Sequence, residues 1–254
     1  MARWMVIVGA VLVVLLIVGT ILAFALAMAR KQWAGQDPTT LVRVTRVVAI
    51  IWTGVAVVGA AVALLTALLA PGVAITMPIR EFWPQLPDTV ALDVGTARRV
   101  SGGFTEVTLT VEGLDATARV LWAFSQAITW VVPGFVALFV AVTCSRLLSG
   151  AAFTPVVAKM AITTGAVIAL GGVAAQVMGD IAGSIASTQL FGAKGGGWEG
   201  DFPGIDNVFD AWLPSATLQI SFPFWPIAVG LAFAVLAAVL RHGSRLQRDV
   251  KGLV

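Results

Sequence analysis

Five long apolar stretches are the feature that most constrains how this chain can fold. A membrane-spanning helix needs about 20 predominantly apolar residues, and five stretches meet that length: residues 4–29, 47–70, 120–143, 156–181 and 222–240. Charged residues make up only 11% of the chain, whereas a soluble domain typically has about a quarter of its residues charged. The pattern predicts an all-α membrane protein with a five-helix transmembrane bundle.

The first apolar stretch resembles a signal peptide but is longer. No charge lies between Arg3 and Arg30, and this run exceeds the apolar core of about 7–15 residues that a signal peptide contains. We therefore expect residues 1–40 to form an N-terminal extra transmembrane helix with its cytoplasmic connection, and residues 41–254 to form a four-span membrane domain. Pro133 and Gly134, in the middle of the third span, predict a kink there because proline removes a backbone donor.

The basic residues are distributed unequally over the segments between the spans. The segment 30–46, the connection 144–159 and the C-terminal tail carry ten basic and two acidic residues, and the segments on the other side carry six basic and eleven acidic residues. Because Lys and Arg are enriched in cytoplasmic loops, we predict a bacterial inner-membrane protein, that is, one of the plasma (cytoplasmic) membrane. Its N-terminus is expected outside and its C-terminus in the cytoplasm. The basic residues serve topology here, so no nucleic-acid partner is expected.

The C-terminal tail combines a basic stripe with an apolar one. Leu246, Val250 and Leu253 recur at helical spacing beside four basic residues: Arg241, Arg245, Arg248 and Lys251. This combination is typical of an amphipathic helix at a membrane surface. The tail is expected to contact either the lipid bilayer or a protein partner at the cytoplasmic face.

Two long exterior loops are predicted, at about 71–119 and 183–221. In the first loop the alternation of Val107 to Val111 with threonines predicts a strand. Residues 89–94 form a second candidate strand, with residues 98–103 as the turn of a small β-hairpin. Asp115 is a candidate N-cap for the helix that continues into the third span.

The second exterior loop mixes acidic and aromatic side chains. Its acids do not follow the spacing of a calcium-binding loop, so we interpret them as solvated charge: Glu199, Asp201, Asp206 and Asp210. The aromatic residues fit either the headgroup level of a membrane or an apolar lip over the exterior mouth of the bundle: Trp198, Phe202, Phe209 and Trp212.

Few residues offer chemistry. With Cys144 as its one cysteine and His242 as its one histidine, the chain has no intramolecular disulfide, CxxC metal site, histidine metal centre or Ser-His-Asp triad within a span. We expect no metal, no cofactor and no enzymatic activity. Polar residues within spans are the default functional candidates, and here Gln126, Gln176 and Asp180 are the candidate intramembrane site. Gln176 and Asp180 share one helix face.

Two stretches resemble the bacterial membrane-protein family known as domain of unknown function 2975. They are the connection SRLLSGAAFTPVVAKM (145–160) and the terminal FAVLAAVLRHGSRLQRDVKGLV (233–254). Gly150, Phe153 and Thr154 match in the connection, and the matches in the tail are Gly243, Ser244, Arg245, Leu246, Gln247, Leu253 and Val254. The resemblance covers about residues 41–254, while the extra first span and the long exterior loop depart from the family. It implies a small helical bundle without assigned chemistry. Members are often encoded beside a helix-turn-helix regulator, which implies regulation or a stress response.

Three functions remain open at this point. The leading one is a non-enzymatic multi-pass membrane protein of regulatory or partner-binding type. A rival is a transporter or binding protein for a small molecule or ion, with its site between the third and fourth spans at Gln126, Gln176 and Asp180. A third is an accessory subunit of a larger membrane complex, docked through the glycine-lined fourth span. The sequence leaves the oligomeric state open.

Overall fold

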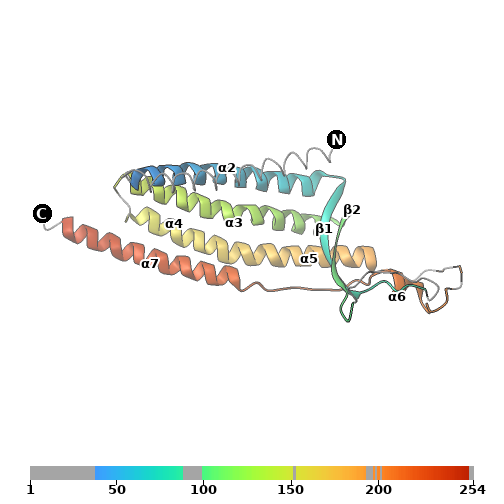
Figure 1. Ribbon diagram of the computed structural model, residues 1–254. Coiled ribbons are helices and arrows are strands. Elements are labelled where there is room, and N and C mark those ends of the chain that lie inside the picture. The colour runs from blue at the N-terminus through green and yellow to red at the C-terminus, as the bar shows by residue number, and fades with distance from the viewer. Residues whose placement is uncertain are drawn as a thin grey trace, which may run out of the picture. The chain divides into compact units, whose positions relative to one another are not determined.

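The computed structural model describes residues 38–87, 99–150, 153–192, 197, 199–200 and 202–251. In these ranges the chain is mostly helical, and a two-stranded antiparallel sheet follows the first of the long helices (Figure 1). The chain divides into two compact units. The first unit comprises Met1–Val58, Trp130–Leu170 and Trp225–Val254, and the second comprises Gly59–Thr129 and Gly171–Phe224.

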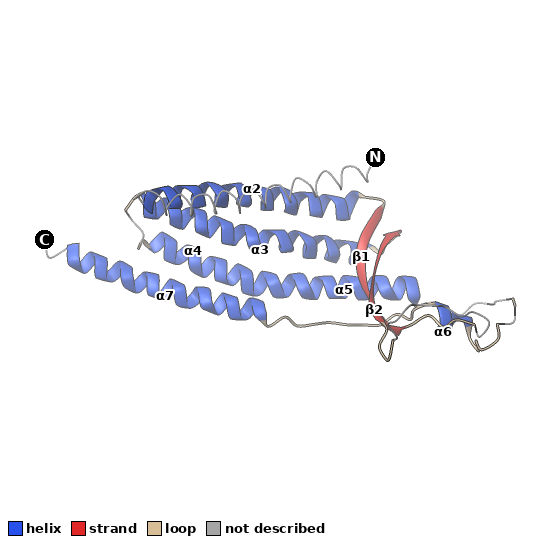
Figure 2. Cartoon of the chain, in the orientation of Figure 1, coloured by secondary structure: helices blue, strands red, loops and turns tan. Residues whose placement is uncertain are grey.

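Four helices in the described part of the chain are long and apolar enough to cross a membrane, which indicates a multi-pass membrane protein. They are α2 (Pro38–Leu69), α3 (Ala116–Leu148), the continuous path from α4 (Pro155–Ala166) to α5 (Gly172–Phe191), and α7 (Trp225–Lys251) (Figure 2). They correspond to the second to fifth predicted spans. The first predicted span, residues 4–29, lies outside the described residues.

Two of the long helices have notable interior features. α3 runs as one helix from Ala116 to Leu148 with Pro133 inside it, and the kink predicted there stays a prediction. The path from α4 to α5 contains a π turn, η1 (Val167–Gly171), which the hydrophobic pattern did not predict. A π turn pairs residues five apart instead of four apart and often occurs at functional sites.

The sheet confirms one predicted strand and pairs it with a strand that was not predicted. β2 (Phe104–Glu112) contains the predicted Val107 to Val111 and pairs antiparallel with β1 (Gly72–Phe82). β1 begins directly after α2, at the Pro71-Gly72 stop. The expected partner strand at residues 89–94 lies outside the described part of the chain, as do all residues from 88 to 98. The partner that the structure shows for β2 is therefore β1.

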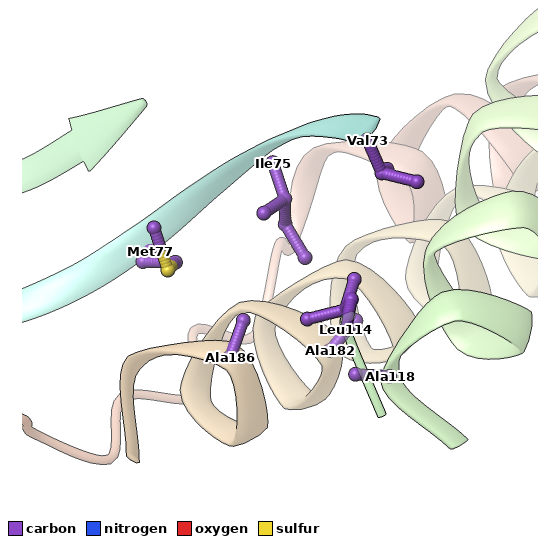
Figure 3. Close-up of a cluster of buried hydrophobic side chains, with 7 residues drawn as sticks. All are labelled: Val73, Ile75, Met77, Leu114, Ala118, Ala182 and Ala186. Carbon is purple, nitrogen blue, oxygen red and sulfur yellow. The ribbon is translucent and has the colours of Figure 1, made fainter. Parts of the chain in front are cut away.

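The core of the second unit lies between β1 and the helices. Val73, Ile75 and Met77, which alternate along β1, are almost completely buried and lie on the side of the strand that faces α5 (Figure 3). They pack with Leu114 and with three alanines: Ala118, Ala182 and Ala186. The strand comes very close to α5, because a Cβ added at Gly183 would lie 2.5 Å from the Thr76 carbonyl oxygen. Small residues on α5 therefore allow the sheet to dock.

The first unit has a separate core in which α4 and α7 are in close contact. Val157 and Ala161 of α4 and Ala237 of α7 are completely buried, and Phe139 of α3 joins them. A Cβ added at Gly165 would lie 2.8 Å from the Gly230 carbonyl oxygen. Such close backbone approach through small residues is characteristic of helix packing in membranes.

Candidate functional site

Two of the three predicted intramembrane site residues are in contact. Gln176 Nε2 donates to Asp180 Oδ1 over 2.8 Å, as their spacing on one helix face predicts. Asp180 Oδ2 accepts two further hydrogen bonds from Ser221, from its backbone N–H at 2.6 Å and from its Oγ–H at 2.7 Å. The carboxylate therefore holds the segment that precedes α7 against α5.

The third predicted residue, Gln126, lies on α3. The hydrogen bond from this part of α3 to α5 comes from the preceding residue, Ser125. The Oγ–H of Ser125 donates to the Ala175 carbonyl oxygen over 2.7 Å. Gly179 allows this approach, since a Cβ there would lie 2.9 Å from Ser125 Oγ. The structure thus joins α3 and α5 through a serine that sequence reasoning missed.

Two buried serines on α5 were also missed. The Oγ–H of Ser187 donates to the Pro78 carbonyl oxygen of β1 over 2.6 Å. Ser184 Oγ lies 3.3 Å from both the backbone N and the carbonyl oxygen of Gln219. These serines continue the polar stripe of Gln176 and Asp180 at intervals of three and four residues. This spacing could have identified the two serines from the sequence. It places them on the helix face that forms hydrogen bonds to the sheet and to the segment before α7.

The start of α3 shows the predicted N-cap. Asp115 Oδ1 accepts the backbone N–H groups of Thr117 at 2.8 Å and Ala118 at 3.4 Å, which satisfies donors that have no partner within the helix. The Thr117 backbone N–H, followed by the Thr117 side chain and the Ala118 N–H, lowers the pKa of Asp115 below its ordinary value. This carboxylate is consequently ionised at neutral pH.

A cavity of about 510 Å³, which is largely open on one side, lies beside this N-cap in the second unit. Its lining comes from the residue before α3, from one face of α5 and from the segment before α7: Asp115, Ser184, Ile185, Thr188, Gln189 and Leu218. Gln189 fixes one wall, because Oε1 accepts from the Asp115 backbone N–H and Nε2 donates to the Gly113 carbonyl oxygen, each over 2.9 Å. The cavity thus lies between the ends of the third and fourth predicted spans, at different residues from those predicted.

The C-terminal tail is helical, and it continues the last span without a break. α7 extends through Lys251, and Arg241 and Arg245 on it are exposed. Arg248 and Lys251 lie on the same helix, but the described side chains of α7 end at Arg245. Leu253 of the predicted apolar stripe lies outside the described residues. The basic residues are therefore on an extension of the spanning helix.

The residues that carry the family resemblance meet at one place in the first unit. A Cβ added at Gly243 would lie 2.8 Å from Phe153 Cδ1, so the Phe153 ring lies on the backbone of α7. Gly150, with a φ of 70°, ends the turn after α3, a conformation that glycine adopts without strain. Thr154 is the N-cap residue of α4, and its Oγ1 is buried without a hydrogen-bond partner. The connection between α3 and α4 therefore packs against the first turn of the basic tail.

The acidic and aromatic loop shows ring contacts in its described part. Phe202 and Trp212 pack edge to face, with ring centroids 4.9 Å apart, and the Trp212 indole N–H donates to the Gln85 carbonyl oxygen over 2.8 Å. Trp198 and Asp201 lie outside the described residues. In the described ranges, including this loop, no group of three or more His, Cys, Asp or Glu side chains is arranged to hold a metal ion.

Comparison with protein-family models, curated proteins and solved structures found no match. What the protein does is therefore inferred from its residues and their contacts.

Proposed function

We propose that the chain is a non-enzymatic multi-pass membrane protein of regulatory or partner-binding type, whose basic end binds a protein partner in the cytoplasm. The observation that carries this proposal is the contact between Phe153 and Gly243. It brings the connection between α3 and α4 onto the basic extension of α7. Two segments far apart in the sequence thereby form a single surface.

The side chains on this surface are of the kinds that bind proteins. Leu147 and Phe153 are 48% and 45% exposed, and Arg146, Arg241 and Arg245 are exposed as well. Aromatic residues and arginine are enriched among the residues that dominate protein interfaces. Basic charges beside apolar side chains also suit a lipid surface. A protein partner is proposed because two segments far apart in the sequence form this surface, and a partner segment that combines acidic and apolar residues would match it.

The cytoplasmic location of this surface rests on the charge distribution of the sequence. The segments expected on the same side carry ten of the chain's sixteen basic residues, which favours N-terminus outside and C-terminus inside, in the plasma membrane. Likeness to the family domain of unknown function 2975 is part of this proposal, because the matching residues Phe153 and Gly243 are those in contact.

The two alternative functions receive less support. A transporter site at Gln126, Gln176 and Asp180 would need Asp180 available to a substrate, yet its carboxylate accepts hydrogen bonds from Gln176 and Ser221. An accessory subunit docked through the fourth span would need free glycines there. Gly165, Gly179 and Gly183 instead contact other parts of this chain.

Affinity purification from native membranes tests the proposal. We would compare the intact chain with an Arg241→Ala, Arg245→Ala double variant and with a control, Arg80→Ala, Arg99→Ala, which removes the same charge near the sheet. We expect a protein that co-purifies with the intact chain and the control and is lost with the tail variant. Equal recovery with all three chains, or no partner with any of them, would contradict the proposal and leave the tail as a topology and lipid anchor.

A further inference from the structure

We propose that the cavity beside Asp115 binds an organic ammonium group carried on an amphiphilic molecule. The cavity, of about 510 Å³, falls within the size range of small-molecule sites, about 300–1,000 Å³. All of its lining residues belong to the second unit, whereas Phe153 belongs to the first. Both its charge and its hydrogen-bonding groups determine the class of ligand.

Among the residues that the structure describes, Asp115 contributes the one charged side chain to the cavity lining. Both N–H bonds of the helix cap end on Oδ1, and the Thr117 side chain also hydrogen-bonds to this carboxylate. A carboxylate oxygen in this position attracts a cation and repels phosphate or carboxylate ligands. A divalent metal ion is a poor match, because calcium takes about 6–8 oxygen ligands and this cavity offers a single carboxylate.

The hydroxyl groups in the wall present acceptors to a ligand. The Oγ–H of Ser184 donates to the Gln219 carbonyl oxygen at 3.3 Å, and the Oγ1–H of Thr188 donates to the Ser184 carbonyl oxygen at 2.9 Å. Because a hydroxyl has one donor and two acceptor lone pairs, Thr188 Oγ1 retains acceptor capacity. A ligand that donates hydrogen bonds and carries positive charge, such as a protonated amine, fits these groups.

The remaining walls are apolar. Ile185 lines the cavity from α5, and Leu218, which is 76% exposed, lines it from the segment before α7. On α3 the uncharged run that crosses the membrane begins at Val120, five positions after Asp115 and thus about 7–8 Å along the helix. The cavity therefore lies near the end of a spanning segment, where a molecule with an apolar tail in the lipid places its headgroup.

Two sources supply such a group: a lipid with a primary amine in its headgroup, and a free amphiphilic amine. Native mass spectrometry of the purified full chain with phosphatidylethanolamine, phosphatidylglycerol or octylamine distinguishes them. Retention of phosphatidylethanolamine in preference to phosphatidylglycerol identifies a lipid ligand. Retention of octylamine alone identifies a free amine.

Asp115→Asn is the variant that tests the proposal, because asparagine is as good an N-cap as aspartate and removes only the charge. We expect amine binding to weaken about tenfold or more, the size of a lost charge-assisted hydrogen bond. The control is Glu112→Gln, which removes a nearby acid that does not line the cavity and should leave binding unchanged. Ile185→Trp, which fills the cavity, should abolish binding while the Asp115 cap is retained. Equal binding by Asp115→Asn and the intact chain, or no retention of either amine, would overturn the proposal.

Discussion

Asp180 accepts hydrogen bonds from Gln176 of its own helix and from Ser221 of the segment before α7, and its removal should release that segment. In Asp180→Ala the Ser221 N–H and O–H and the Gln176 amide lose their acceptor. We expect a loss of unfolding free energy on the order of 1–3 kcal/mol, because hydrogen bonds to charged groups are worth about that much. Hydrogen exchange measured on peptides from residues 213–224 should be faster in the variant.

The control for this change is Asp206→Ala, which removes an exposed acid from the loop that contains Ser221. Exchange in residues 213–224 should stay at the level of the intact chain in that variant. Unchanged exchange in Asp180→Ala would show that the segment is held by other contacts.

Asp115 gives the fold a dependence on acidic pH. The capping N–H groups, that of Thr117 first, lower the pKa of this carboxyl in the folded chain. A lowered folded pKa means that the carboxylate stabilises the fold above the unfolded pKa, and that this contribution is lost as the pH falls through the folded pKa. In ¹³C NMR of the labelled carboxyl, we expect a titration midpoint below that of an unstructured aspartate.

Asp115→Asn should remove this acid-dependent contribution, because the amide does not titrate and still caps the helix. A midpoint at or above the unstructured value would mean that the capping bonds do not persist in solution.

At the scale of the elements, two glycines differ in how much space surrounds them: Gly165 lies in the contact between α4 and α7, and Gly54 lies on an open face of α2. A Cβ at Gly165 would lie 2.8 Å from both the Gly230 carbonyl oxygen and Phe233 Cβ, whereas a Cβ at Gly54 of α2 would meet nothing within 4 Å. We expect Gly165→Ala to destabilise the fold by about 1–3 kcal/mol through overpacking. Gly54→Ala should be neutral or stabilising by up to about 1 kcal/mol, because alanine favours helix.

Thermal unfolding in detergent, followed by circular dichroism, measures the difference between these two variants. Equal midpoints for Gly165→Ala and Gly54→Ala would show that the two helices separate enough to accept a methyl group.

The elements also show what the sequence was able to predict. Apolar length alone located α2, α3, the path from α4 to α5, and α7, because a lipid-exposed backbone must be helical when no sheet can close. It did not locate the end of α5, which continues ten residues beyond the predicted Ile181 to Phe191. Those residues include Ser184 and Ser187, whose partners lie on Gln219 and Pro78. Hydrophobicity does not reveal such long-range hydrogen bonds.

Strand β1 was not predicted, for a related reason. β2 could be predicted from the sequence because threonines alternate with its apolar residues. Asp115 could be predicted as an N-cap from its residue type and its position before an apolar run. β1 has small or apolar residues on both faces near Val73 and Ile75, so no period of two stood out. Its burial against Ala182 and Ala186 is a tertiary contact that determines strand structure more than the local pattern does.

At the scale of the whole molecule, the predicted orientation is open to a direct measurement. In a Cys144→Ser background, Val100→Cys places a thiol near the sheet at a position that is 95% exposed, and Arg245→Cys places one on the basic tail. We expect a membrane-impermeant maleimide to label Val100→Cys in intact cells and Arg245→Cys only after permeabilisation. The reverse pattern would invert the topology and move the proposed partner surface out of the cytoplasm.

The π turn at Val167–Gly171 interrupts the regular rotation of residues around the helix axis in the path from α4 to α5. One residue of an α-helix corresponds to a rotation of about 100°, so an extra residue in a turn rotates everything after it by that angle. Gly165, before the turn, faces α7, and Gly183, after it, faces β1. A one-residue insertion or deletion at this turn would leave the spacing of residues within each half unchanged and would alter only the helical phase between the halves. The same change inside α4 or α5 would in addition break the spacing of residues within that half.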